Sequence, residues 1–153
     1  MSTVAPAPLG VRGAVRVAAI SAAPLDVDAH LQAVDDPAAG AVATFVGRVR
    51  DHDPDAASAV DALEYSAHPD AESALQRIAE AAASESRALV AVSHRVGRLS
   101  VGDVAVVIAV ASAHRGDAFA ACRTLIETIK TDLPVWKRQV EIDGTATWLG
   151  LGG

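Results

Sequence analysis

The sequence predicts an α+β fold in which three main helices pack on a mostly antiparallel sheet. Residues 25–34, 68–86 and 116–133 have the apolar spacing of helices, and β-branched or alternating segments lie between them. Two of those segments, 89–99 and 102–113, are joined by a short Ser-Val-Gly-Asp connection, which predicts an antiparallel pair because a parallel pair needs a long crossover. Of the 153 residues, 51% are hydrophobic and 21% are charged, which is typical of one globular domain.

The first part of the chain alternates a strand, a short helix and a second strand. The segment "GAVRVAAIS", residues 13–21, predicts the first strand, and a short helix follows it. The β-branched segment "GAVATFVGRVR", residues 40–50, opens at a glycine and predicts a strand with Arg48 and Arg50 near its end. The acidic, proline-containing residues 51–60 predict a flexible loop.

The middle of the chain contains a strand, an amphipathic helix and the strand pair. Residues 61–67 predict the strand, and residues 68–86 predict the helix. The apolar side of this helix contains Ala74, Leu75, Ile78 and Ala82. Residues 102–113 are apolar on both faces, which indicates a central strand.

The last part contains the clearest helix of the sequence, residues 116–133. Pro134 ends this helix, because proline excludes the helical conformation from the residue before it. Residues 137–142 alternate as a last strand, and Asp143-Gly144 forms a turn after it.

Three regions follow from these elements. Residues 13–148 are expected to form a single domain. Residues 1–12 are rich in proline and alanine and are expected to be a flexible N-terminal tail, and residues 149–153 a flexible C-terminal end.

Composition excludes several classes of protein. A net charge of -6 argues against a general nucleic-acid-binding protein, which needs a basic face. The sequence has no apolar run of membrane-spanning length and its start lacks the pattern of a secretory signal, so we expect a cytoplasmic protein. The single Cys122 excludes an internal disulfide and a cysteine-built metal site, and we interpret it as a small core residue.

A metal site is not expected among the histidines and carboxylates either. His52, Asp53, Asp55 and His68 have a spacing that fits no usual metal site, so solvated loop residues are the better interpretation. His94 and Arg95 lie within a predicted strand, where a structural hydrogen bond is the simplest role.

Lys130 and Lys137 are the only lysines in the sequence. Apart from histidines, all other basic residues are arginines. Arginine stays charged, whereas the pKa of a lysine falls readily on burial, so a lysine amine can move protons or attack carbon. Two interpretations are open, a chemical role and two surface lysines that lie together by accident.

The position of Lys130 on the predicted helix favours a cleft. Lys130 lies only about 20° around the helix axis from Phe119 at 100° per residue, which predicts that it lies on the buried side. The apolar stripe beside it contains Cys122, Ile126, Ile129 and Leu133. The alternative is that Lys130 extends into solvent from the last turn, where a cation suits the helix dipole.

His114 and Arg115 precede the same helix, at the end where free backbone N–H groups favour an anion. The alternative is a simple capping turn with Asp117. Arg115 and Lys130 are about 22 Å apart along the axis at 1.5 Å per residue, too far for one small molecule within one subunit. A shared site therefore requires two copies of the chain, which predicts a homodimer.

Four separated segments carry a resemblance to a known family. "GAVATFVGRVRDHD", "LEYSAHPDAE", "SHRVGRLSVGD…SAHRGDAF" and "IKTDLPVWKRQ" together resemble the large, catalytic subunit of molybdopterin synthase, over residues 13–148. The most distinctive parts are the two lysines seven residues apart around Pro-x-Trp, and the Ser-Ala-His-Arg turn.

The resemblance implies a fold, partners and a reaction. The fold is of the α/β-hammerhead type, and a central homodimer binds a small ubiquitin-like sulfur carrier at each end, which makes a heterotetramer. The carrier's C-terminal Gly-Gly thiocarboxylate enters the pocket of the large subunit. Two sulfurs are then transferred to cyclic pyranopterin monophosphate, which forms the dithiolene of molybdopterin in molybdenum cofactor biosynthesis.

The resemblance also implies roles for individual residues. Lys130 matches the principal catalytic lysine and Lys137 the second lysine of the pocket. The substrate-binding residues are implied to be Arg48, Arg50, His114, Arg115, Lys130, Lys137, Arg138 and Gln139. His114 and Arg115 come from the neighbouring subunit, and Gln139 departs from the acidic residue often found at its position. No metal or cofactor is required.

Three other interpretations stay open from the sequence. The chain is a non-catalytic module that binds a ubiquitin-like carrier through a basic pocket, or a lyase that forms a Schiff base on Lys130. The terminal "WLGLGG" resembles the end of a sulfur carrier. Because the family segments occupy nearly the whole chain, a flexible end is the better interpretation of that Gly-Gly.

Overall fold

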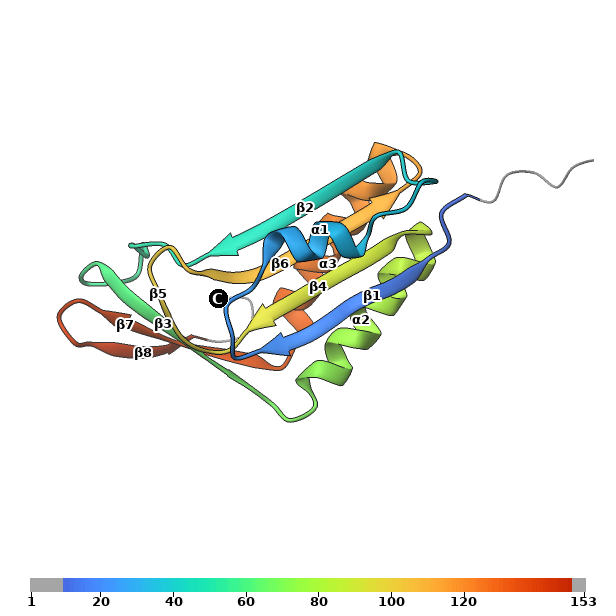
Figure 1. Ribbon diagram of the computed structural model, residues 1–153. Helices are drawn as coiled ribbons and strands as arrows, with labels where there is room; N and C mark the ends of the chain where they lie inside the picture. Colours follow the sequence, from blue (N-terminus) through green and yellow to red (C-terminus); the bar gives the residue numbers. More distant parts are fainter. Residues whose placement is uncertain (1–9, 150–153) are drawn as a thin grey trace, which may run out of the picture.

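The computed structural model describes residues 10–149, which form two four-stranded sheets and three helices (Figure 1). The first sheet contains, in spatial order, β1 (Ala14–Ser21), β4 (Leu89–Arg95), β6 (Val104–Ser112) and β2 (Ala41–Arg48). The second sheet contains β5 (Gly97–Ser100), β3 (Val60–Ala67), β7 (Val135–Glu141) and β8 (Ala146–Leu149). The second sheet projects from one end of the first (Figure 1).

The helices cover both faces of the first sheet. They are α1 (Val27–Ala33), α2 (Ala71–Ser86) and α3 (Arg115–Asp132). Helices α2 and α3 lie on one face and α1 lies on the other (Figure 1). Strands β4 and β6 alternate accordingly, since Val92 and Ile108 pack under α2 and α3, while Ala91 and Ala109 belong to the cluster on the α1 side. Burial on both faces explains the continuous apolar sequence of β6, which is an inner strand as predicted.

The α+β class, the three helices and the mostly antiparallel pairing are confirmed, with two differences. The predicted strand 89–99 is in fact two strands, β4 and β5, that belong to different sheets. The chain turns at Gly97, whose φ of 98° is a left-handed conformation that favours glycine. The expected single sheet is therefore two sheets, and β1 pairs with β4 in parallel.

The apolar face of α3 is rotated relative to the prediction. The buried residues of this helix are Ala118, Ala121, Cys122, Leu125, Ile126 and Ile129. Phe119 is 66% exposed, and Lys130 is exposed rather than on the buried side. The alanines explain the difference, because these small residues let the helix approach the sheet closely and so move the centre of the buried face away from Phe119. Cys122 lies in the core as predicted, and burial raises the pKa of its thiol.

Some predicted features fall at the ends of the chain. Residues 1–9 of the predicted N-terminal tail, and residues 150–153 with the terminal Gly-Gly, lie outside the described residues. Of the three helices in residues 10–149, none is both long and apolar enough to cross a membrane.

Arg87 provides a test of backbone strain. It ends α2 with φ 47° and ψ 52°, a left-handed conformation that costs a residue with a side chain about 1–2 kcal/mol. We expect Arg87→Gly to raise the free energy of unfolding by about 0.5–1 kcal/mol, after the greater entropy of glycine in the unfolded chain is counted. Thermal denaturation measures this as a melting temperature higher by roughly 1–4 °C.

Gly144 is the matched control. It has φ 90° with no atom near the position of an added Cβ, so Gly144→Ala introduces strain without a clash. We expect this variant to be less stable by about 1 kcal/mol. Equal melting temperatures for wild type and both variants would contradict the strain assigned to these two positions.

Candidate active site

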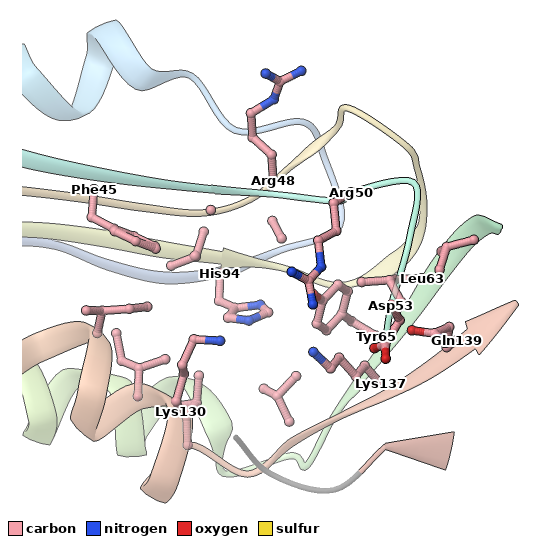
Figure 2. Close-up of a pocket in the computed structure, with 18 of the residues that line it drawn as sticks. Phe45, Arg48, Arg50, Asp53, Leu63, Tyr65, His94, Lys130, Lys137 and Gln139 are labelled. Carbon is pink, nitrogen blue, oxygen red and sulfur yellow. The ribbon is translucent and has the colours of Figure 1, made fainter. Parts of the chain in front are cut away.

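A cavity of about 410 Å³ lies where the second sheet meets the end of the first sheet and the end of α3 (Figure 2). It is lined by Phe45, Gly47, Arg48, Arg50, His52, Asp53, Val60, Leu63, Tyr65, His94, Ala105, Val106, Ile126, Ile129, Lys130, Leu133, Val135, Lys137 and Gln139. The floor is apolar and the rest is rich in nitrogen groups, which is typical of a site that orients a ligand with few polar contacts.

The turn after α3 brings the two lysines into this cavity. Helix α3 ends where Leu133 adopts an extended conformation before Pro134, and β7 begins at the next residue. Leu133 is 1% exposed, and the carbonyl of Pro134 accepts a hydrogen bond from the N–H of His68 at 3.0 Å, so the turn is fixed at both ends. Lys130 enters from the last turn of α3 and Lys137 from β7, and their amines point toward one another (Figure 2).

Alternation along β7 selects which residues face the cavity. Lys137 and Gln139 line it, whereas Arg138 points to the other face of the sheet. Arg138 is held there by Glu64, whose Oε2 lies 2.7 Å from Nη2 and 2.9 Å from Nε. The structure therefore separates Arg138 from the two lysines, and Gln139, which is 7% exposed, belongs to the wall of the cavity.

Lys137 has the electrostatic environment expected of a reactive amine. Burial lowers the pKa of Lys137, and the positive charges of Lys130 and Arg50 lower it further, while Asp53 acts in the opposite direction. At a given pH, burial and neighbouring cations therefore give Lys137 a larger fraction of neutral amine than a surface lysine has.

The two predicted arginines of β2 and its following loop have different positions. Both residues line the cavity, but only the side chain of Arg50 extends into it toward Lys137, whereas the guanidinium of Arg48 points away (Figure 2). The Nε of Arg48 donates to the carbonyl of Gly102 at 3.1 Å, so this side chain holds the turn between β5 and β6. A register shift between Gly47 and Arg48 accompanies this divergence.

His114 and Arg115 lie at the opposite end of α3 and do not line the cavity. Both are exposed, and His114 is the N-cap residue but makes no side-chain capping hydrogen bond. Asp117 lies in the first turn of α3, so the capping role considered for it is not observed. One copy of the chain therefore does not bring these two residues to the lysines.

Sequence reasoning missed several residues of the cavity. The structural hydrogen bond expected for His94 is present, since its Nδ1 lies 2.8 Å from the carbonyl oxygen of Arg95. The same ring also lines the cavity, against the edge of Tyr65 at a centroid distance of 5.0 Å. The alternation of "LEYSA" places Leu63 and Tyr65 on one face of β3 and was the available signal.

The loop after β2 also contributes to the cavity. His52 and Asp53, expected to be solvated loop residues, border its opening. The far end of the loop is fixed, because the N–H of Ser58 donates to Oε1 of the buried Glu141 at 2.9 Å. Within residues 10–149 no group of three or more His, Cys, Asp or Glu side chains is arranged to hold a metal ion.

These features define a half-enclosed cavity lined by lysine and arginine side chains, a charge pattern that suits anionic ligands. The family model described as "MoaE protein" matches residues 20–132. The chain therefore belongs to the MoaE family, the catalytic subunits of molybdopterin synthase.

Individual relatives agree with this family. The chain is 39% identical over 137 residues to the molybdopterin synthase catalytic subunit of Nostoc sp., covering 88% of this chain and 82% of that protein. It is 40% identical over 129 residues to molybdopterin synthase catalytic subunit 1 of Mycobacterium tuberculosis, covering 83% and 86%.

Solved structures share the fold. The molybdopterin synthase of Staphylococcus aureus matches with a TM-score of 0.78 and 32% identity, covering 86% of this chain and 95% of that chain. A Helicobacter pylori structure, described as a protein–protein complex of subunits 1 and 2 of molybdopterin-converting factor, matches in fold with a TM-score of 0.66 at 19% identity, covering 88% of each chain.

The charges around Lys137 give a titration test. The sequence has two lysines, so carbon-13 NMR of labelled lysine shows two ε-methylene signals, which Lys130→Met assigns. We expect Lys137 to titrate below its ordinary pKa of 10.5. Lys130→Met and Arg50→Met should raise this pKa, and Asp53→Asn should lower it further.

Arg98 is the control for these variants, because it pairs with Asp61 and Glu64 at 3.1 Å on the second sheet and does not line the cavity. Arg98→Met should leave the titration of Lys137 unchanged. A pKa that responds equally to all four substitutions would contradict the local origin of the shift.

Proposed function

We propose that this chain transfers two sulfurs from the thiocarboxylate of a small sulfur-carrier protein to cyclic pyranopterin monophosphate, which forms the dithiolene of molybdopterin. The observation that carries this proposal is the placement of Lys130, Lys137 and Arg50 around one cavity. The relatives named above support the reaction.

The charge of the cavity suits the two reactants. The pterin carries a phosphate and the carrier carries a thiocarboxylate, so two anions must share one site in a protein whose net charge is -6. Three cations around the cavity reduce the repulsion between these anions, and Arg50 offers a planar fork for phosphate. Lys130 and Lys137 then act on the reacting groups by proton transfer and by stabilising negative charge.

The carrier is the partner that delivers sulfur. A C-terminal Gly-Gly has no side chains, so such a tail enters a cavity of about 410 Å³ that already contains several long side chains. A two-subunit complex of this kind is the description of the Helicobacter pylori structure of the same fold. Gln139 in the cavity wall is uncharged, so it does not offset the positive charge of the cavity.

The remaining parts of the proposal concern assembly and location. His114 and Arg115 of one subunit complete the cavity of the other in a homodimer, because the two ends of α3 are too far apart to meet within one chain. With two carriers the assembly is a heterotetramer. Residues 13–148 form the catalytic domain, and the protein acts in the cytoplasm.

Replacing Lys130 tests catalysis against simple binding. We expect Lys130→Ala to reduce dithiolene formation by at least about 10²-fold, since it removes a positioned acid and a charge. Carrier affinity, measured by calorimetry, should change little. Reconstitution with thiocarboxylated carrier and pterin precursor measures both, and unchanged turnover would favour the non-catalytic binding module.

The Schiff-base alternative has its own readout. Borohydride added during turnover should leave the mass of the chain unchanged if Lys130 acts by proton transfer. A reduced substrate adduct on Lys130 would support the lyase instead.

Mixing two inactive variants tests the shared site. Lys130→Ala and Arg115→Ala should each be nearly inactive as pure proteins. After exchange of subunits, half of the dimers combine the two variants and contain one intact site, so about one quarter of the wild-type activity should return. Mixtures that stay inactive, although mass spectrometry shows mixed dimers, would contradict the homodimer site.

A further inference from the structure

His94 is a buried histidine to which the proposed function assigns no role. It lies at the end of β4, where its residue is 8% exposed and its ring lines the cavity. The ring lies between Lys130 and Tyr65 (Figure 2). A rigid inner strand therefore presents an imidazole to the same space as the two amines.

The hydrogen bond of His94 fixes which nitrogen is free. Nδ1 lies 2.8 Å from the carbonyl oxygen of Arg95, and a carbonyl only accepts, so Nδ1 carries the hydrogen. In the neutral ring Nε2 is then the unprotonated nitrogen. Among residues 10–149 no protein group makes a hydrogen bond to this Nε2, so its lone pair is available to a ligand or to water.

The neighbours of His94 keep the ring neutral. Burial lowers the pKa of His94 below its ordinary value of 6.5, and the charges of Lys130 and Lys137 lower it further, against the opposing effect of the Arg95 carbonyl. The ionisable side chains from other elements that line the same cavity are Lys130 of α3, Lys137 of β7, Tyr65 of β3, Arg48 of β2, and Arg50, His52 and Asp53 after β2.

Most of these neighbours are less suited than His94 to accept a proton. Lys130 and Arg50 are cations, and burial raises the pKa of Tyr65, which keeps its hydroxyl protonated. Asp53 belongs to the loop at the opening and interacts with Lys137. His94 is a neutral base that the scaffold holds inside the cavity, and a base of this kind is effective at neutral pH.

Sulfur transfer from a thiocarboxylate requires a base at one step, and this inference rests on the function proposed above. When the carrier's sulfur forms a bond to pterin carbon, the carrier stays attached through an acyl–sulfur bond. Release requires a nucleophile at the acyl carbon, and water is the one that leaves the carrier as a free acid.

We infer that His94 is the general base that activates this water. Nε2 takes one proton from water, and the resulting hydroxide adds to the acyl carbon of the carrier's last glycine. The acyl–sulfur bond then breaks, the sulfur leaves on the pterin as a thiolate, and the carrier leaves as a carboxylic acid. The imidazolium passes its proton to the thiolate or to solvent, and no electrons are gained or lost.

The test separates sulfur–carbon bond formation from carrier release. The synthase is mixed with thiocarboxylated carrier and cyclic pyranopterin monophosphate, and intact mass spectrometry follows the carrier–pterin adduct and the free carrier in a single turnover. His94→Asn keeps an amide donor for the Arg95 carbonyl and removes the base. We expect the adduct to form and then persist, with release slowed by about 10²- to 10⁴-fold and partly restored by added imidazole.

A second buried histidine is the matched control. His30 lies on the opposite face of the first sheet, where its Nε2 is 2.7 Å from Ser93 Oγ. His30→Asn should release the carrier at the wild-type rate, which separates loss of a buried ring from loss of the base. If His94→Asn does not fold, His94→Gln replaces it in the same assay.

The pH dependence of the wild type gives a readout that needs no variant. Carrier release should fall as pH drops through a midpoint below 6.5, because protonation of His94 removes the base. Three results would each overturn the inference. Folded His94→Asn or His94→Gln could release the carrier at the wild-type rate, or these variants could form no adduct. In the wild type, carrier release could stay equally fast at low pH. Failure of the wild type to make any sulfur-bearing pterin would instead overturn the proposed function.

Discussion

The repulsion between positive charges in one half-enclosed cavity is the constraint on which this site depends. Lys137 is partly buried, and Lys130 and Arg50 are close enough to lower its pKa. Such an arrangement is unfavourable when the cavity contains only water, because burial already disfavours a charged amine. It becomes favourable when anions enter, since each new negative charge removes part of the repulsion and replaces the lost hydration. The cost of holding these cations together is therefore the source of affinity for an anionic tail and an anionic substrate.

The fold maintains this arrangement through the junction between its two parts. The buried Leu133 anchors the end of α3, and Pro134 directs the chain into β7. The register of β7 on β3 then decides that Lys137 faces inward, opposite Tyr65, while Arg138 pairs with Glu64 outside. A shift by one residue would exchange these roles, so the ion pair in which two nitrogens of Arg138 contact Oε2 of Glu64 on the outer face also secures the position of the amine.

Much of the fold was predictable because hydrophobic periodicity and glycine or proline positions are local signals. The three helices and the central strand follow from such patterns. The division of residues 89–99 between two sheets was not predictable, because the β4 and β5 segments form a continuous β pattern and the partner of each is decided by distant chain. The two lysines were identifiable by residue type alone, but the exposure of Phe119 depends on how closely alanines let α3 approach the sheet.

The sequence predicted the cationic residues of the site, but it did not predict most of the neutral residues that line the cavity. Residue type and the family resemblance indicated Lys130, Lys137 and Arg50. They indicated Arg48 equally, and only the structure shows that its guanidinium turns away from the cavity toward the carbonyl of Gly102. His94 has a main-chain hydrogen bond on one nitrogen and the cavity on the other, and no sequence pattern distinguishes that ring from a wholly structural one.

The most direct measurement of the central claim is the NMR titration of Lys137 in the presence of cyclic pyranopterin monophosphate. If the phosphate enters the cavity and offsets the repulsion, the pKa of Lys137 should rise toward 10.5 as the ligand saturates. Saturable binding that leaves the Lys137 signal and its titration unchanged would show that the anion binds elsewhere, and the account of this cavity would be wrong.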